Sequence, residues 1–258
     1  MDFGLAGKRV LVVGASKNIG AAIAKCFATE GAFVTLIARD MHKLYDLVEE
    51  IGGVNSGHGF IAVDLLSPAE PSRISEIILN KFGHYDIVVH NLGGALGYKD
   101  PFGRVEDWES VWRFNVGVAI EMNKILIPPM LARGWGRVIH ISSISAEHGE
   151  PLSHEGGAIP YAAAKAYLNA YVKGLGRECA KKNVIVTAIM PGVVLSEGKY
   201  WDRACREQPE YVADFISHNY SIGRFCRPDE IAPFAVFLAS EQASFAAGSI
   251  IPIDGGRI

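Results

Sequence analysis

The fold is decided by the stretch Val10-Leu11-Val12-Val13-Gly14-Ala15-Ser16-Lys17-Asn18-Ile19-Gly20, which runs into an alanine-rich segment ending near Gly31. Consecutive apolar, largely β-branched residues are typical of a strand that is covered on both faces. The glycine-rich turn that follows leaves bare backbone beside a helix N-terminus, an arrangement that favours an anion such as a phosphate. An ordinary loop between a strand and a helix has a similar composition, so the turn alone is weak evidence for a nucleotide site.

Asn18 stands in this turn where a third glycine is expected. Asparagine is among the non-glycine residues that best tolerate a positive φ, so the sequence predicts a softened form of the same turn. Gly14 and Gly20 suit the tight turn and the close approach of the helix to the strand. The position of the turn directly after the first strand favours a nucleotide over an ordinary loop.

Further apolar runs follow the first strand, and most of them are continuous rather than alternating. They cover residues 33–37, 60–63, 87–89, 138–141, 184–189 and 250–253. The segments between them are long enough for the crossover helices that parallel strands require. We therefore predict an α/β fold, a single Rossmann-type, doubly wound domain over residues 1–258 with a seven-stranded parallel sheet and helices on both faces. Residues 196–228 interrupt this alternation of strands and helices. They are rich in aromatic and charged side chains and are predicted to form a substrate lid.

The predicted helices have sequence signals at their ends and one internal interruption. Asp40 is placed to cap the helix that follows it. Pro160 precedes an alanine-rich helix predicted over 161–182, because proline is favoured in a first helical turn. The stretch 106–133 contains Pro128-Pro129, so a kink or break is predicted at these prolines.

The composition argues against several classes of function. The chain has 258 residues, with 25 Lys and Arg against 28 Asp and Glu and no basic run, so nucleic-acid binding is not expected. No apolar stretch reaches the roughly 18 residues that a membrane helix needs. The four cysteines contain no Cys-x-x-Cys pair, which suits a reducing cytoplasm better than a zinc site or a disulfide framework. The N-terminus lacks a basic segment before an apolar core, so we expect a cytoplasmic protein without a secretory signal.

Two residues at the end of the second strand bear on the choice of nucleotide. In dinucleotide-binding folds this position faces the adenosine ribose, where an acid accepts from a 2′-hydroxyl and an arginine accommodates a 2′-phosphate. Arg39 comes before Asp40, and Lys17 lies in the glycine turn. This pattern favours NADP over NAD, with Asp40 as a helix cap; the alternative gives Asp40 the ribose contact. Asp64, after the third strand, either accepts from the adenine amino group or caps the next helix.

Tyr161 and Lys165 lie one turn apart on the predicted alanine-rich helix. A free tyrosine has a pKa of about 10, and a nearby ammonium lowers it by stabilising the phenolate. Such a phenol can pass a proton to a carbonyl oxygen. Ser142-Ser143 ends the fifth strand at its carboxyl end, where open α/β sheets bind ligands. Each motif alone is usually structural, as a surface Tyr–Lys pair or as a serine at the start of a loop. The order of the serine, tyrosine and lysine in the chain, after a glycine turn, favours a catalytic set.

With these motifs the chain resembles the short-chain dehydrogenase/reductase family over nearly its whole length. The resembling positions are Gly14, Asn18 and Gly20, Asp64-Leu65, Asn91 and Gly93, Asn115, Ser143, Tyr161 and Lys165, Pro191-Gly192, 227–232 and 254–256. The sequence departs from the family pattern at Val13, Asn18, His90 and Leu92. These departures concern details of the cofactor loop.

The resemblance implies a role for each matching residue. Tyr161 would be the general acid in reduction, Ser143 rather than Ser142 would position the carbonyl, and Lys165 would also bind the nicotinamide ribose. Asn115 would complete the catalytic set by holding a proton-relay water. The implied cofactor-binding residues are Gly14, Ser16, Lys17, Asn18, Ile19, Gly20, Arg39, Asp64, Leu65, Asn91, Gly93, Tyr161, Lys165, Pro191, Gly192, Val194 and Ser196. The resemblance also implies a homotetramer, or a homodimer, built through the two long helices and the last strand.

The predicted activity is NADP(H)-dependent interconversion of a ketone and a secondary alcohol, with NAD(H) as a second cofactor. The loops 93–102 and 147–157 and the predicted lid are polar and aromatic, so we expect a polar, sugar-like ketone. A 3-oxoacyl-thioester reductase and a non-catalytic NADP-sensing protein are the alternatives. An enoyl-thioester reductase is disfavoured because such relatives space the tyrosine and lysine more widely, and an epimerase or dehydratase because the chain leaves no room for a larger substrate domain.

The eight histidines raise the question of a metal site. His90 and His140 lie in predicted buried strands, where a hydrogen-bonded core histidine is expected rather than a ligand. His148 and His154 share a loop with three glutamates, and a solvated loop is favoured there over a metal or a cationic substrate. No metal site is predicted.

Overall fold

The computed structural model describes residues 2–148 and 158–257. Its sheet has seven strands in the order β3-β2-β1-β4-β5-β6-β7, and every neighbouring pair is parallel. The strands are β1 (Arg9–Val13), β2 (Phe33–Ala38), β3 (Gly59–Ala62), β4 (Ile87–His90), β5 (Gly136–Ile141), β6 (Val184–Pro191) and β7 (Ile250–Ile253). The predicted fold class is confirmed. Within the described residues, no helix is long and apolar enough to span a membrane.

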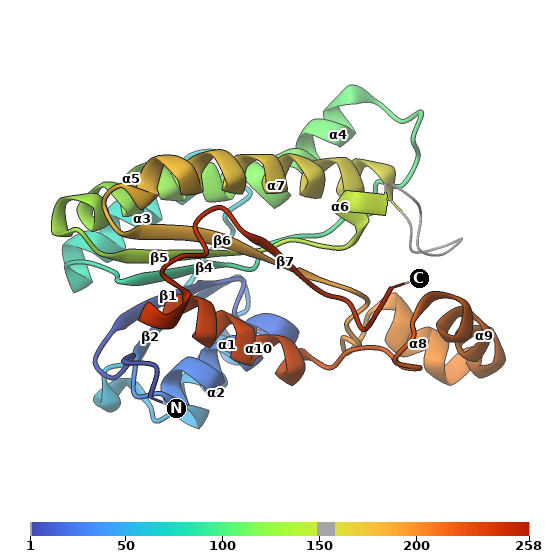
Figure 1. The fold of residues 1–258 in the computed structure, drawn as a ribbon, viewed down its shortest axis with the longest axis horizontal. Helices are drawn as coiled ribbons and strands as arrows, with labels where there is room; N and C mark the ends of the chain where they lie inside the picture. The colour runs from blue at the N-terminus through green and yellow to red at the C-terminus, as the bar shows by residue number, and fades with distance from the viewer. Residues whose placement is uncertain (1, 149–157, 258) are drawn as a thin grey trace.

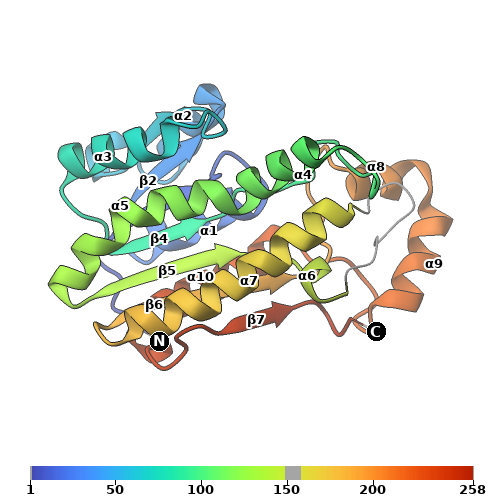
Figure 2. The same cartoon turned by 90° about the horizontal axis from the view of Figure 1, so that it is seen from above.

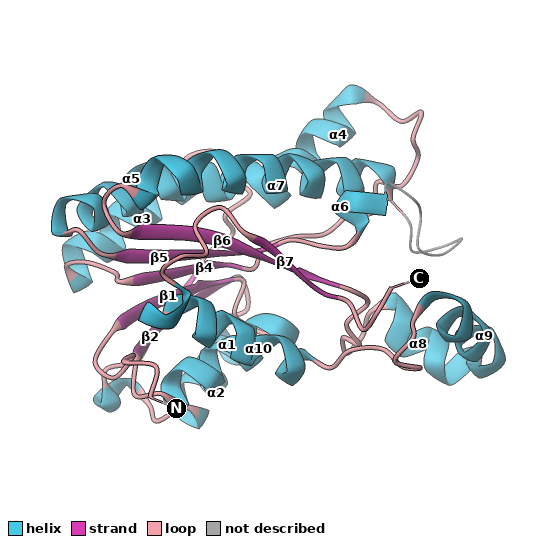
Figure 3. Ribbon diagram, in the orientation of Figure 1, coloured by secondary structure: helices cyan, strands magenta, loops and turns pink. Residues whose placement is uncertain are grey.

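Helices cover both faces of the sheet (Figures 1 and 3). One face carries α1 (Asn18–Thr29), α2 (Met41–Glu50) and α10 (Pro228–Ala239), and the other carries α3 (Glu70–Phe82), α5 (Val118–Arg133) and α7 (Ile159–Ala180). Two short 3₁₀ turns, Val54–Ser56 and Glu241–Ala243, lie in connecting segments. Each face has its own apolar core, because the strands contribute side chains alternately to the two sides. Burial on both sides explains why the strands are continuously apolar in sequence.

The strand order places a crevice at the carboxyl edge of the sheet. β1 pairs with β2 on one side and with β4 on the other, so the winding direction reverses there. In open α/β sheets this reversal point is where ligands bind. The shorter helices α4 (Val105–Trp112), α6 (Ser145–His148), α8 (Tyr200–Glu207) and α9 (Pro209–Asn219) lie at this end of the molecule (Figure 2).

The prediction of a break at Pro128-Pro129 is wrong. α5 continues through both prolines to Arg133 and ends at Gly134, whose φ is 70°. Pro128 is exposed, so the carbonyl that loses its helical hydrogen bond can be satisfied by water. The irregularity lies earlier, in a π-helical turn over Arg113–Gly117 that separates α4 from α5.

The segment 196–228, which we call the lid, forms α8 and α9 with a small core of their own. Its aromatic residues pack on one another: the ring centroids of Trp201 and Phe215 are 4.4 Å apart, and those of Trp201 and Phe225 are 4.8 Å apart. These rings join Val193 and Tyr220 in a third apolar cluster, separate from the two large ones. The Tyr220 hydroxyl also accepts the backbone N–H of Val193 at 3.2 Å. The aromatic residues therefore hold the two lid helices together.

Candidate active site

The glycine turn adopts the backbone that its sequence predicts. Gly14 and Asn18 have φ values of 82° and 51°, so Asn18 does adopt a left-handed conformation. A side chain on Gly20 would overlap the Gly14 carbonyl oxygen, which is why the helix can approach the strand only at a glycine. The Asn91 side-chain amide donates to that same carbonyl at 2.9 Å and ties the end of β4 to the turn. α1 begins with no side-chain cap and no acidic residue in its first turn, which leaves its N–H groups open to an anion.

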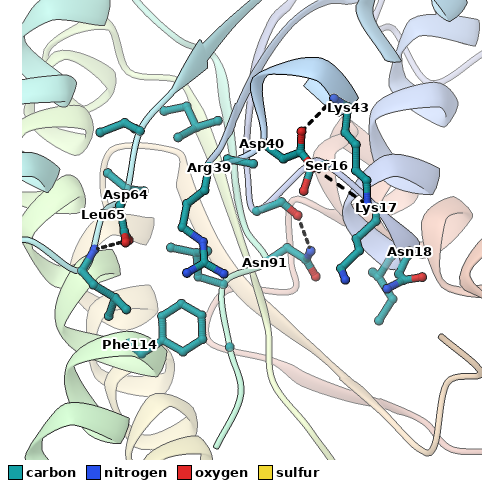
Figure 4. Close-up of a pocket in the computed structure, with 18 of the residues that line it drawn as sticks. Ser16, Lys17, Asn18, Arg39, Asp40, Lys43, Asp64, Leu65, Asn91 and Phe114 are labelled. Atoms are coloured by element: carbon teal, nitrogen blue, oxygen red, sulfur yellow. Dashed lines mark hydrogen bonds and ion pairs between the residues drawn. The ribbon is translucent and has the colours of Figure 1, made fainter. Parts of the chain in front are cut away.

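A cavity of about 400 Å³ lies over this turn. Figure 4 shows Arg39, Lys17 and Lys43 gathered at it, with Asp40 and Asp64 nearby. Lys199, from the lid, is the fourth cation that lines it. Among residues 2–148 and 158–257, no carboxylate forms an ion pair with Lys17, Arg39 or Lys199. Unpaired cations that converge on one cavity indicate an anionic ligand.

Both acids in this cavity make local backbone contacts. Asp40 accepts the backbone N–H of Lys43 at 3.2 Å and caps α2, as the sequence predicts. Asp64 accepts the backbone N–H of Leu66 at 3.1 Å. α3 begins only at Glu70, so Asp64 does not cap that helix. The second oxygen of Asp40 lies 3.9 Å from the Lys43 ammonium. Asp64 has only one oxygen occupied and lines the cavity together with Arg39.

A second cavity of about 240 Å³ continues from the first. Ser143, Tyr161 and Lys165 line it, so the structure brings the three predicted catalytic side chains together. Pro191 at the end of β6 lines the same cavity, as do Gly192 and Val194 directly after the strand. Both cavities share several lining residues, namely Ile19, Asn91, Leu92, Gly93 and Ser196. Together they form one crevice with cations at one end and hydroxyl groups at the other.

Tyr161 and Lys165 differ electrostatically from the sequence prediction. Burial raises the pKa of Tyr161, and a hydrogen bond with Ser143 only partly offsets this effect, so the predicted lowering of the pKa is wrong for this state. Burial also lowers the pKa of Lys165 to about 7. Its ammonium donates to the Ile141 carbonyl oxygen at 2.7 Å and lies 5.7 Å from the centroid of the Tyr161 ring. Tyr161 therefore stays protonated at neutral pH and is suited to donating a proton.

The two neighbouring serines have different surroundings. Ser142 is buried, and its hydroxyl lies 2.6 Å from Asn169 Oδ1 on α7, one turn beyond Lys165. Ser143 is more exposed and lies 3.2 Å from the Ser145 hydroxyl. Ser142 thus fastens the strand to the helix that carries Tyr161 and Lys165. Ser143 remains the hydroxyl that can face a substrate, in agreement with the choice made from the family resemblance.

Asn115 does not line either cavity; it shapes the loop beside them. It lies in the π-helical turn, where its amide donates to the carbonyl oxygens of Val111 at 2.8 Å and Gly94 at 2.9 Å. The side-chain oxygen of Asn115, Oδ1, accepts the backbone N–H of Gly94 at 3.1 Å. This contact places Gly93 directly against Lys165: a Cβ on Gly93 would lie 2.8 Å from Lys165 Nζ and 2.9 Å from Asn115 Oδ1.

We expect Gly93→Ala to lower kcat/KM by roughly a hundredfold while the protein stays folded, because a displacement of about 1 Å at a catalytic group has such effects. The atoms displaced are the ends of two side chains, Lys165 Nζ and Asn115 Oδ1, and no backbone atom is among the closest contacts, so we expect the fold to be kept. Gly174→Ala is the matched control, since its Cβ would meet nothing within 4 Å. Steady-state kinetics with thermal melting measures both effects, and unchanged kinetics in Gly93→Ala would show that Lys165 tolerates displacement.

Two histidines lie buried behind Lys165. His90 and His140 are partners in the register of β4 and β5, and their rings stack with centroids 4.8 Å apart. His90 Nε2 donates to Asn123 Oδ1 at 2.8 Å. Among the described residues, neither ring nitrogen of His140 has a hydrogen-bond partner. The expectation of hydrogen-bonded core histidines therefore holds for His90 and is wrong for His140. Burial lowers the pKa of His90 to about 4, and burial with the charges of His90 and Lys165 lowers that of His140 well below 6.5.

The crevice collects most of the site residues predicted from sequence. Gly20 and Asn115 are the two that do not line it, and both act through their neighbours. Sequence reasoning missed Lys43, Phe114 and Lys199 as lining residues. Lys43 could have been found from its place one helical turn after Arg39. Most of the predicted loop 147–157 lies outside the described residues, and no group of three metal-binding side chains occurs in the part of the chain that the structure describes.

Comparison with known proteins identifies the family of this chain. A family model described as Enoyl-(Acyl carrier protein) reductase matches residues 14–257. The chain belongs to the short-chain dehydrogenase/reductase family. As a short-chain dehydrogenase/reductase it is an oxidoreductase.

Relatives of this short-chain dehydrogenase/reductase include enzymes named for different substrates. A 3-oxoacyl-[acyl-carrier-protein] reductase FabG from Thermotoga maritima is 30% identical over 98% of this chain and 99% of its own length. A D-threitol dehydrogenase from Mycolicibacterium smegmatis is 33% identical over 99% of this chain and 94% of its own. A solved structure of L-sorbose reductase from Gluconobacter frateurii, complexed with NADPH and L-sorbose, is 32% identical with a TM-score of 0.88, over 99% of this chain and 98% of that one.

Proposed function

We propose that this enzyme uses NADP(H) to interconvert a polar ketone and its secondary alcohol. The observation that carries the proposal is the single crevice, in which unpaired cations lead to Ser143, Tyr161 and Lys165. A hydroxyl, a phenol and an ammonium at one wall are the groups needed to hold and protonate a carbonyl oxygen. The family relationship makes a nicotinamide the group that completes the reaction.

The cofactor proposal rests on the cations around the adenosine end. Arg39 and Lys17 line that cavity without a carboxylate partner among the described residues, and Lys43 lies 3.9 Å from Asp40. A 2′-phosphate would satisfy these charges, whereas a 2′-hydroxyl would leave them uncompensated. The NADPH and NADP complexes of related enzymes support the same choice. We therefore assign NADP(H) as the preferred cofactor and NAD(H) as the weaker one.

The residues of the second cavity supply the acid–base chemistry. When bound, the reduced nicotinamide supplies a hydride to the carbonyl carbon. Ser143 donates a hydrogen bond to the carbonyl oxygen, and Tyr161 transfers its hydroxyl proton to that oxygen. The phenolate left on Tyr161 is stabilised by the charge of the nearby Lys165 ammonium. The hydrogen bond to the Ile141 carbonyl oxygen positions this ammonium. In the reverse direction the same groups remove the alcohol proton.

Two observations favour a small hydroxylated substrate. The reactive cavity is only about 240 Å³, and six of its thirteen lining residues have polar side chains, among them Asn91, Ser143 and Ser196. The relatives that act on L-sorbose and D-threitol point the same way. Relatives named 3-oxoacyl-[acyl-carrier-protein] reductase favour a 3-oxoacyl thioester as the second candidate.

The test is a substrate panel that follows the absorbance of the reduced nicotinamide with NADPH and with NADH. We expect NADPH-dependent turnover of oxo-sugars and hydroxylated ketones at a higher kcat/KM than acetoacetyl-coenzyme A, long-chain ketones or steroid ketones. A preference for acetoacetyl-coenzyme A would establish the second candidate instead. Cofactor binding without turnover of any carbonyl compound would indicate a nucleotide-sensing protein.

A further inference from the structure

Lys199 is a cation that the proposed chemistry leaves unused. It directly precedes α8 in the lid and lines the larger cavity, which the glycine turn also lines. Among residues 2–148 and 158–257, its ammonium has no hydrogen bond or ion pair. The nearest acid in its turn, Asp202, is already engaged by the backbone N–H of Gly198 at 2.8 Å and by Arg206 at 2.9 Å. The lid therefore presents an uncompensated positive charge to the crevice.

The cavity linings place Lys199 along the crevice. Ser196 lines both cavities and marks their junction, whereas Lys199 lines only the larger one. Arg39 and Lys43 mark the far, adenosine end of that cavity. Ser16 and Asn18, at the start of α1, line the same cavity. Lys199 thus shares a cavity with the open N–H groups of α1.

An extended dinucleotide places its pyrophosphate between the adenosine and the nicotinamide. Its two negative charges suit the N-terminus of α1, which has neither an acidic side chain nor a cap. Lysine is a point charge on a flexible stem and binds phosphate without a fixed geometry. Such a side chain can therefore reach a phosphate from a segment that moves relative to the sheet.

We propose that Lys199 binds the pyrophosphate of the dinucleotide and thereby holds the lid over the crevice when cofactor is present. The inference rests on the proposed function, because it needs a dinucleotide in the crevice. The lid is suited to such control because its aromatic residues form a separate core, so α8 and α9 can move as a unit. Cofactor binding then stabilises the closed position of the lid by the free energy of the contact between Lys199 and the phosphate, which the open position lacks.

The first test compares Lys199→Met with the control Arg203→Met. In the wild-type chain Arg203 pairs with Glu207 and does not line the cavity. Calorimetry measures the Kd of NADPH, NADH and adenosine 2′-monophosphate. We expect Lys199→Met to weaken NADPH and NADH equally, by roughly tenfold to a hundredfold, the effect of one charged hydrogen bond. Adenosine 2′-monophosphate, which has no pyrophosphate, should bind as it does to Arg203→Met. Arg39→Ala should give the opposite pattern, with the loss confined to the two ligands that carry a 2′-phosphate.

The second test measures the lid itself by limited chymotrypsin digestion, because Tyr200, Trp201 and Tyr211 supply cleavage sites in it. Saturating NADPH should slow cleavage of the lid in the wild-type chain and in Arg203→Met, but much less in Lys199→Met. Equal protection in all three, or a Kd change confined to NADPH and adenosine 2′-monophosphate, would overturn the inference. Failure of the wild-type chain to bind NADPH or NADH would instead overturn the proposed function on which it rests.

Discussion

Tyr161→Phe should lower kcat by a factor of roughly a hundred to ten thousand, the range that general acid catalysis supplies. The variant removes only the phenolic oxygen, and with it the proton that the carbonyl oxygen must receive. The ring and its contact with Lys165 remain, so cofactor affinity should change by less than about threefold. Stopped-flow or steady-state loss of reduced-nicotinamide absorbance measures turnover, and calorimetry with NADPH measures binding.

Tyr167→Phe is the matched control for this variant. Tyr167 lies on the same helix but is half exposed and packs edge-on against Trp112 at 5.8 Å, outside the reactive cavity. It should retain wild-type turnover. If Tyr161→Phe also kept its turnover, the proton would have to come from another group, and the assignment of Tyr161 would be wrong.

Acidification should destabilise the protein between about pH 6.5 and pH 4 through its buried histidines. A histidine whose pKa is lowered by folding is neutral in both states above pH 6.5. Below that pH the unfolded chain takes up a proton that the folded chain does not, so stability falls until the folded pKa is reached. For His90, whose folded pKa is about 4, the loss amounts to roughly 3 kcal/mol. His140 acts in the same direction, because its pKa lies well below 6.5.

Urea unfolding at a series of pH values between 7.5 and 4 measures this loss. His140→Phe should flatten the curve, because the variant keeps a ring against His90 and Tyr171 and removes a titrating group with no hydrogen-bond partner among the described residues. His218→Gln is the control, since the His218 side chain is exposed and lies outside the buried histidine pair. A pH dependence identical in His140→Phe and wild type would contradict the prediction. The carboxylates add their own loss at lower pH, as with Glu230, whose pKa is held near 2 by Arg224 and the Arg227 backbone.

The sequence predicts the fold because its signals are local. Continuous apolar runs identify strands covered on both faces, and the left-handed φ of Asn18 follows from its place in the turn. The capping of α2 by Asp40 is equally local, since it joins residues three apart. The same holds for Tyr161 and Lys165, whose spacing on a helix places them on one face.

What the sequence could not predict depends on distant parts of the chain. The effect of Pro128 depends on which side of α5 faces water, and this is set by packing. The direction of the Tyr161 pKa depends on how far the crevice is buried, which outweighs its hydrogen bond with Ser143. Lys199 lines the same cavity as the glycine turn although the two are far apart in the sequence, and this depends on the packing of the lid at the carboxyl edge of the sheet. Whether a core histidine finds a partner depends on distant residues too: His90 bonds Asn123, whereas His140 has no hydrogen-bond partner among the described residues.

The separate core of α8 and α9 has an evolutionary consequence. Trp201, Phe215 and Phe225 stabilise one another without contributing to either large core. Substitutions in this segment can therefore accumulate without weakening the scaffold that carries Tyr161 and Lys165. If this segment covers the substrate as predicted from sequence, substrate preference can change while the chemistry stays constant, and the relatives are indeed named for different compounds.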